Sequence, residues 1–88
     1  MVGLTRAAAL EGAKENLRVN ALVTGNVDTP LLRSMLPPDA GLDPVAPNPT
    51  ERLAKPAEIA AFVAFLLSDE CPFLTGAALA VDGGFTAQ

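Results

Sequence analysis

The chain has 88 residues, half of them hydrophobic, and a formal net charge of −4. Its six lysine and arginine residues are scattered, so it lacks the clustered cations that nucleic-acid binding requires. It contains no His, Tyr or Trp, which excludes imidazole and phenol acid/base catalysis by its own side chains.

The length suffices for one small domain and no more. A domain of this size buries only about 60% of its unfolded surface, so this apolar content predicts that part of it faces a neighbour. The longest apolar stretch, residues 59–67, is far shorter than the roughly 20 residues of a membrane span. Residues 1–10 lack the pattern of a signal peptide. We therefore expect no membrane partner.

Cys71 is the one cysteine, so no internal disulfide can form. This is typical of the reducing cytoplasm, where we expect the protein to reside. A single thiol is most often a small buried apolar group. A nucleophilic thiol would need a nearby base, and the commonest base, histidine, is absent.

Residues 1–13 are predicted to form a helix, because apolar positions such as Leu4 and Leu10 suit one packed face and alanine has the highest helix propensity. No Ser, Asp or Asn precedes these residues as an N-cap, so the segment looks like a helix entered part-way along. Asn16 can adopt the left-handed conformation that ends a helix.

Residues 17–23 are predicted to form a short strand that is buried on both faces, as in a parallel sheet. Asn20 is the polar exception within it. A buried amide needs hydrogen-bond partners, so we favour a structural bridge over a catalytic role for this side chain.

A loop is expected over residues 24–30, followed by a short amphipathic piece of one or two helical turns over residues 31–36. Residues 37–50 carry five of the eight prolines. Each proline fixes φ and removes a donor, which predicts an irregular arm without a sheet or a long helix.

A second helix is predicted over residues 56–68, with Pro56 in its first turn and apolar residues nearly all round it. A last strand follows over residues 77–82. The order of helix, strand, arm, helix and strand indicates an α/β fold with parallel strands joined by a crossover. Two parallel strands do not make a stable sheet alone, so we expect them to need neighbours.

Five segments carry short motifs in a fixed order. They are VGLTRAAALE at residues 2–11, LRVNA at 17–21, GNVDTP at 25–30, RLAKPAEIA at 52–60, and LTGA at 74–77 with VDGG at 81–84. Together they resemble the short-chain dehydrogenase/reductase family, in its active-site helix, the next strand, the PGxVxTP cofactor loop, a later helix entry and the VDGG ending. Each motif alone is weak, but five in order are specific.

The resemblance implies a doubly wound, Rossmann-type parallel sheet that binds NAD or NADP. Residues 1–88 would be its carboxy-terminal part, with a cofactor loop at 24–30, a substrate lid at 31–52, a helix at 56–68 and the last strand at 77–82. The family's catalytic Tyr, Lys and Ser and its glycine-rich phosphate turn are all expected before Met1. We therefore predict no catalytic residue, no metal ligand and no tight cofactor binding by this chain alone.

The resemblance assigns cofactor binding to the loop after the first strand. In the family, the backbone near Val27 and the side chain of Thr29 bind the nicotinamide carboxamide and the neighbouring phosphate. Considered without the resemblance, Gly25 is a turn residue and Thr29 caps the next helical piece, with Pro30 at its first position. Both interpretations can hold. The candidate cofactor-binding residues are Gly25, Asn26, Val27 and Thr29.

One residue departs from the family pattern, because Thr24 stands where the family usually has proline.

A second candidate group would form the substrate lid or simply pack the fold: Leu31, Leu32, Met35 and Leu36. We interpret Asp82 as a turn residue at a strand end and not as a catalytic acid.

Two hypotheses of function remain. In the first, the chain is part of an NAD(P)-dependent oxidoreductase acting on an alcohol or ketone, inactive alone, whose complete form binds a small-molecule substrate and assembles as a homodimer or homotetramer. In the second, it is a non-catalytic interaction subunit that packs its apolar helix against a full-length relative. A cooperative thermal transition of the chain alone would favour the second.

Overall fold

A computed structural model describes residues 1–37 and 48–88. Along the chain come the helix α1 (Val2–Gly12), the 3-10 turn η1 (Ala13–Glu15), the strand β1 (Ala21–Thr24), the helices α2 (Pro30–Ser34) and α3 (Pro56–Leu67), the strand β2 (Ala78–Val81) and the 3-10 turn η3 (Phe85–Ala87). The predicted α/β order is confirmed.

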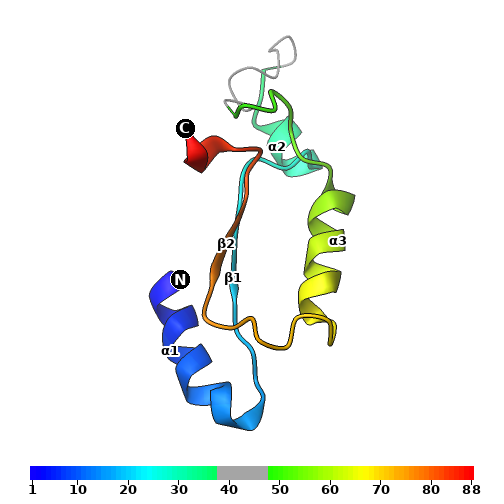
Figure 1. Cartoon of the computed structure of the whole chain (residues 1–88). Helices are drawn as coiled ribbons and strands as arrows, with labels where there is room; N and C mark the ends of the chain where they lie inside the picture. The colour runs from blue at the N-terminus through cyan, green and yellow to red at the C-terminus, as the bar shows by residue number, and fades with distance from the viewer. Residues whose placement is uncertain (38–47) are drawn as a thin grey trace.

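The sheet consists of β1 and β2, which run parallel in a register that pairs Ala21 with Ala78 and Thr24 with Val81. Figure 1 shows this strand pair between α1 and α3, the layered arrangement that a crossover between parallel strands produces. At the same end of both strands lie α2 and the carboxy terminus.

The end of the helical segment formed by α1 and η1 is set by local sequence, as predicted. Asn16 is left-handed (φ 63°), and its amide donates to the carbonyl of Ala13 at 3.2 Å. The amide of Leu17 donates to the carbonyl of Gly12 at 3.1 Å, which completes a Schellman motif. The start of α1 has no side-chain cap, as its sequence indicates.

Both strands are shorter than predicted, four residues each in place of residues 17–23 and 77–82. Asn20 is the structural bridge expected: its side-chain NH2 donates to the carbonyl of Leu74 at 3.1 Å, and its Oδ1 accepts from the amide of Ala77 at 3.1 Å. These side-chain bonds occupy the backbone where the ladder would otherwise extend. The prediction that β1 is buried on both faces is wrong for this chain, because Val23 remains 41% exposed.

α3 begins at Pro56 as predicted and ends at Leu67, with Ser68 as its C-cap. Its first turn is held by Glu58, whose carboxylate accepts from the backbone amide of Lys55 at 2.7 Å. Its last turn is held from β1's side by Arg18, whose Nη2 donates to the carbonyls of Leu66 at 2.7 Å and Ser68 at 3.0 Å. None of the residues of α3 is buried.

The core of the chain is small. A compact protein of 9.0 kDa exposes about 4,900 Å², whereas this chain exposes 6408 Å². In the described part of the chain, the buried residues are Thr5, Ala9, Gly12, Ala21, Asn48 and Leu53. Each strand of the described sheet has one edge without a neighbouring strand. This surface is what strands that need further neighbours would show.

The predicted lid, residues 31–52, is described only in part. Residues 31–37 contain most of α2, residues 48–52 form a turn, and residues 38–47 lie outside the described residues. Among the helices described, none is both long enough and apolar enough to cross a membrane.

Candidate functional site

The candidate site is the loop that leaves the carboxyl end of β1, where open α/β sheets bind their ligands. The amide of Gly25 donates to the carbonyl of Val81 at 3.0 Å, so the loop starts against the end of β2. A Cβ at Gly25 would lie only 3.1 Å from the Cα of Asp82. Glycine therefore suits the close approach of the two backbones here, as expected of a turn residue.

The middle of the loop is fixed by a second strand-like contact. Val27 forms an isolated parallel bridge with Ala54. The amide of Asp28 donates to the carbonyl of Ala54 at 2.8 Å, and the amide of Ala54 donates to the carbonyl of Asn26 at 3.1 Å. Because alternate residues face opposite edges in parallel pairing, the N–H and C=O of Val27 itself point away from Ala54. Both backbone groups of Val27 are therefore directed to the opposite side of the loop.

Thr29 caps α2, as predicted. Its Oγ1 accepts from the amide of Leu32 at 3.2 Å, and Pro30 occupies the first helical position. The hydroxyl hydrogen of Thr29 can still be donated to a second partner, because a hydroxyl is both donor and acceptor. The cap thus fixes the side chain without using its whole hydrogen-bonding capacity.

An ion pair beside the loop was not foreseen from the sequence. Asp28 accepts from Arg33 at both carboxylate oxygens, at 2.8 Å from Nε and 2.9 Å from Nη2. These hydrogen bonds from Arg33 are the main reason that the pKa of Asp28 lies below its usual value. The five-residue spacing crosses the start of α2, so helical periodicity does not indicate this pair. It ties the loop to α2.

The candidate lid residues differ in exposure. Leu31 and Met35 are both 72% exposed, whereas Leu32 and Leu36 are half-buried. α2 therefore presents apolar side chains outward next to the candidate cofactor loop.

Asp82 is a turn residue, as predicted. Its carboxylate accepts from the amides of Gly84 at 3.0 Å and Thr86 at 3.1 Å, and from the hydroxyl of Thr86 at 2.7 Å. The hydrogen bond from the Thr86 side chain is the largest cause of the lowered pKa of Asp82. A carboxylate held in its ionised form by three donors is poorly suited to donate a proton near neutral pH.

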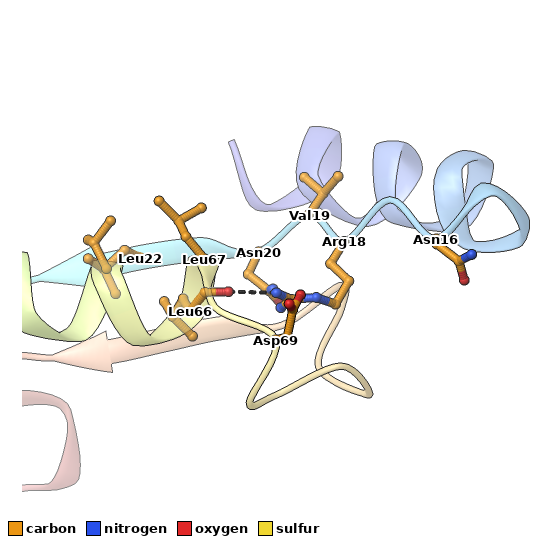
Figure 2. Close-up of a pocket in the computed structure, with 9 residues that line it drawn as sticks. Asn16, Arg18, Val19, Asn20, Leu22, Leu66, Leu67 and Asp69 are labelled. Atoms are coloured by element: carbon orange, nitrogen blue, oxygen red, sulfur yellow. Dashed lines mark hydrogen bonds between the residues drawn. The ribbon is translucent and has the colours of Figure 1, made fainter.

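A hollow of about 470 Å³ lies at the opposite end of the strand pair, between the segment that enters β1 and the end of α3. Figure 2 shows Arg18 in its wall, with a hydrogen bond to the carbonyl of Leu66. Nearby Cys71 is half-buried and not buried as expected, and its Sγ lies 3.6 Å from Nη1 of Arg18. The hollow is at the amino end of β1, so it is not where an α/β sheet binds its ligand.

The loop after β1 offers backbone groups, the exposed side-chain amide of Asn26, the hydroxyl of Thr29 and one carboxylate that is already paired with Arg33. These groups can bind and orient a polar ligand, and no imidazole or phenol accompanies them. Within residues 1–37 and 48–88, no group of three or more His, Cys, Asp or Glu is placed to hold a metal ion.

Comparison with known proteins finds relatives that are named as reductases and dehydrogenases. A family model described as enoyl-(acyl carrier protein) reductase matches residues 1–86. The chain is 49% identical over 89 residues to the 2,5-dichloro-2,5-cyclohexadiene-1,4-diol dehydrogenase of Sphingobium indicum, covering 99% of this chain and 36% of that protein. It is 48% identical over 87 residues to the cis-4-hydroxycyclohexanecarboxylate dehydrogenase of Sinomonas cyclohexanicum, covering 99% and 34%. The chain thus spans about a third of the length of these curated relatives.

Solved structures match the fold. A short chain dehydrogenase family protein from Francisella tularensis superimposes with a TM-score of 0.88 at 38% identity, over 99% of this chain and 40% of the other. ElxO with NADP bound gives a TM-score of 0.88 at 29% identity, over 99% of this chain and 36% of the other. Both matches take in both ends of the strand pair, including the loop after β1.

Proposed function

Since the chain belongs to the short-chain dehydrogenase/reductase family, we propose that it works as the carboxy-terminal part of an NAD(P)-dependent oxidoreductase. The complete enzyme would act on the CH–OH group of an alcohol or on the matching ketone. Two relatives at 49% and 48% identity are named as dehydrogenases of a cyclic diol and of a hydroxycyclohexane carboxylate, which supports this class of substrate.

The observation that carries the proposal is the orientation of the Val27 peptide. Its N–H and C=O face away from Ala54, at the carboxyl end of β1, as a donor and acceptor pair suited to a carboxamide. Gly25 keeps the loop close to β2 and leaves no side chain in the way. When bound, a nicotinamide dinucleotide supplies or accepts the hydride, and a carboxamide is the group that identifies its reactive ring.

The remaining loop residues orient and enclose the ligand. Thr29 donates its hydroxyl hydrogen to an oxygen of the dinucleotide while its oxygen caps α2, and Asn26 lies next to the oriented peptide. Leu31, Leu32, Met35 and Leu36 cover the substrate side and reduce the access of water during hydride transfer. The exposed Leu31 and Met35 are the side chains free to meet an apolar ring.

Proton transfer would fall to residues outside this chain, because it contains no Tyr or His. We expect the 88-residue polypeptide alone to show no dehydrogenase activity. The test has two parts: sequencing the gene immediately upstream of the Met1 codon, and assaying NAD(P)H formation with cyclic alcohols for the chain alone and for the longer reading frame. An in-frame Tyr-x-x-x-Lys and activity only in the longer protein are expected. Turnover by the purified short chain would refute the division of roles.

A partner surface is proposed on α3 and β2. Three large apolar side chains of α3 are exposed, namely Val63 at 36%, Phe65 at 43% and Leu67 at 80%. In the complete enzyme we expect these elements to form the contact of a homodimer or homotetramer in the cytoplasm. Light scattering at micromolar concentration tests this, and a monomer would count against it.

The same exposed face favours a second candidate, a non-catalytic subunit that packs α3 against a full-length relative. A cooperative thermal transition and a single monodisperse peak for the chain alone would favour that candidate. An aggregated sample without a thermal transition would favour the proposal that the chain is part of a larger enzyme.

A further inference from the structure

Asn48 is a buried polar side chain, and few residues are buried in the part of the chain that the structure describes. It is 8% exposed. Its Nδ2 donates to the carbonyl of Arg52 at 3.2 Å, and its Oδ1 accepts from the hydroxyl of Thr50 at 3.0 Å and from the amide of Arg52 at 3.4 Å. One amide side chain therefore closes the turn over residues 48–52.

This turn is packed onto the carboxy-terminal turn that follows β2. Gly83 accepts a hydrogen bond from the amide of Thr50 at 3.3 Å. A Cβ at Gly83 would collide with Oγ1 of Thr50 and would lie 3.1 Å from Cγ of Asn48. The two turns thus fit together without room for one methyl group.

Two residues after Arg52, the same segment meets the cofactor loop. Ala54 makes both backbone hydrogen bonds of the bridge to Val27. Leu53, which lies between Arg52 and Ala54, is 6% exposed. A displacement of the turn would be transmitted to Ala54 through this short, buried stretch. The orientation of the Val27 peptide depends on where Ala54 lies.

We propose that Asn48 is a positioning residue for the dinucleotide: it fixes the 48–52 turn against Gly83, and through Ala54 it sets the orientation of the Val27 peptide that binds the carboxamide. The inference rests on the proposed function. It adds a residue that touches neither cofactor nor substrate but controls how the nicotinamide end is held. The adenosine end of the ligand, bound elsewhere, should not depend on Asn48.

The experiment compares two ligands of the complete enzyme. The Michaelis constant of the preferred dinucleotide reports on the whole ligand, whereas the inhibition constant of ADP-ribose, or its 2′-phosphate, reports on binding without nicotinamide. Asn48→Ala should raise the Michaelis constant of the dinucleotide about tenfold, the equivalent of one lost hydrogen bond. It should leave the inhibition constant of the nicotinamide-free ligand within about twofold. Asn48→Asp keeps the acceptor for Thr50 and Arg52 but loses the donor, so it should fall between.

A matched control separates positioning from stability. Gly12→Ala would place a Cβ 2.9 Å from the side chain of Leu17, at the carboxyl end of α1, a helix that lies away from α2 in Figure 1. This change should lower the melting temperature without altering either constant. If Asn48→Ala does not fold, Thr50→Val removes only the hydroxyl that donates to Asn48 and should raise the dinucleotide constant two- to threefold.

The outcomes are distinct. An unchanged dinucleotide constant in a folded variant, or a parallel rise in both constants, would overturn the positioning role of Asn48. A wild-type enzyme that binds neither ligand would overturn the proposed function, and the inference with it.

Discussion

Replacing Arg18 tests how the end of α3 is attached to the sheet. Its guanidinium donates to two carbonyls of that helix end, Leu66 at 2.7 Å and Ser68 at 3.0 Å, and lies 3.4 Å from the carbonyl of Leu74. Hydrogen bonds from charged donors contribute roughly 1.5–3 kcal/mol each, and water can replace part of them at a half-buried site. Arg18→Ala should therefore lower the free energy of unfolding by about 2–3 kcal/mol.

The assay is thermal denaturation of the complete enzyme followed by circular dichroism. A loss of this size corresponds to a fall in Tm of roughly 5–10 °C for a domain of 150–250 residues. Arg18→Lys should recover about half, because one ammonium group cannot span both carbonyls as the planar guanidinium does. Arg6→Ala, at an exposed position of α1, is the matched loss of charge and should change Tm little. A fall below 1 °C for Arg18→Ala would show that the helix end does not depend on these bonds.

Three further changes probe local features of the site. Thr29→Ala should lower the free energy of unfolding, measured by urea denaturation, by about 1 kcal/mol through loss of the N-cap. Thr29→Ser should lower it less, since serine keeps the accepting hydroxyl. Equal losses in the two variants would argue against the cap. Glu51 is left-handed (φ 55°), so Glu51→Gly should raise Tm by removing about 1 kcal/mol of backbone strain, and a lower Tm would contradict this. The pKa of Glu58 is lowered from 4.5 to about 2, mainly by side-chain hydrogen bonds from Arg52 and next by one from the Lys55 amide. Arg52→Ala should return this pKa toward 4.5, as measured by an NMR titration of the carboxylate. Because the folded-state pKa is the lower one, the ionised pair stabilises the fold above about pH 4.5, and that contribution is lost as the pH falls toward 2. An unchanged Glu58 titration in the variant would exclude Arg52 as the cause.

Features set by neighbouring residues could be predicted from the sequence. Asn16 ends η1, the turn that continues α1, Pro56 begins α3, Thr29 caps α2 and Asp82 forms a turn. In each case the interacting backbone lies within a few residues. The position of a loop at the carboxyl end of the first strand followed from strand order in the same way, and its role in cofactor binding stays a prediction.

Features that depend on distant residues could not be predicted. Arg18 and Leu66 are 48 positions apart, and their contact depends on how α3 lies against β1. The strand lengths depend on where Asn20 and its partners replace the ladder, which no local pattern indicates. The burial of Asn48 could not be predicted either, because its packing against Gly83 requires the strand pair to have formed.

The parallel pairing of β1 with β2 has a consequence for biosynthesis. Asn20 and Ala77, which bond at the entrance to the pair, are separated by 57 positions, so closing that loop costs about 3.6 kcal/mol in chain entropy before any contact offsets it. A ribosome adding roughly 5–20 residues per second needs several seconds to reach the second strand after making the first. During that interval the edge of β1 that pairs with β2 remains unpaired. A chaperone that binds extended apolar segments would recognise β1 at this stage.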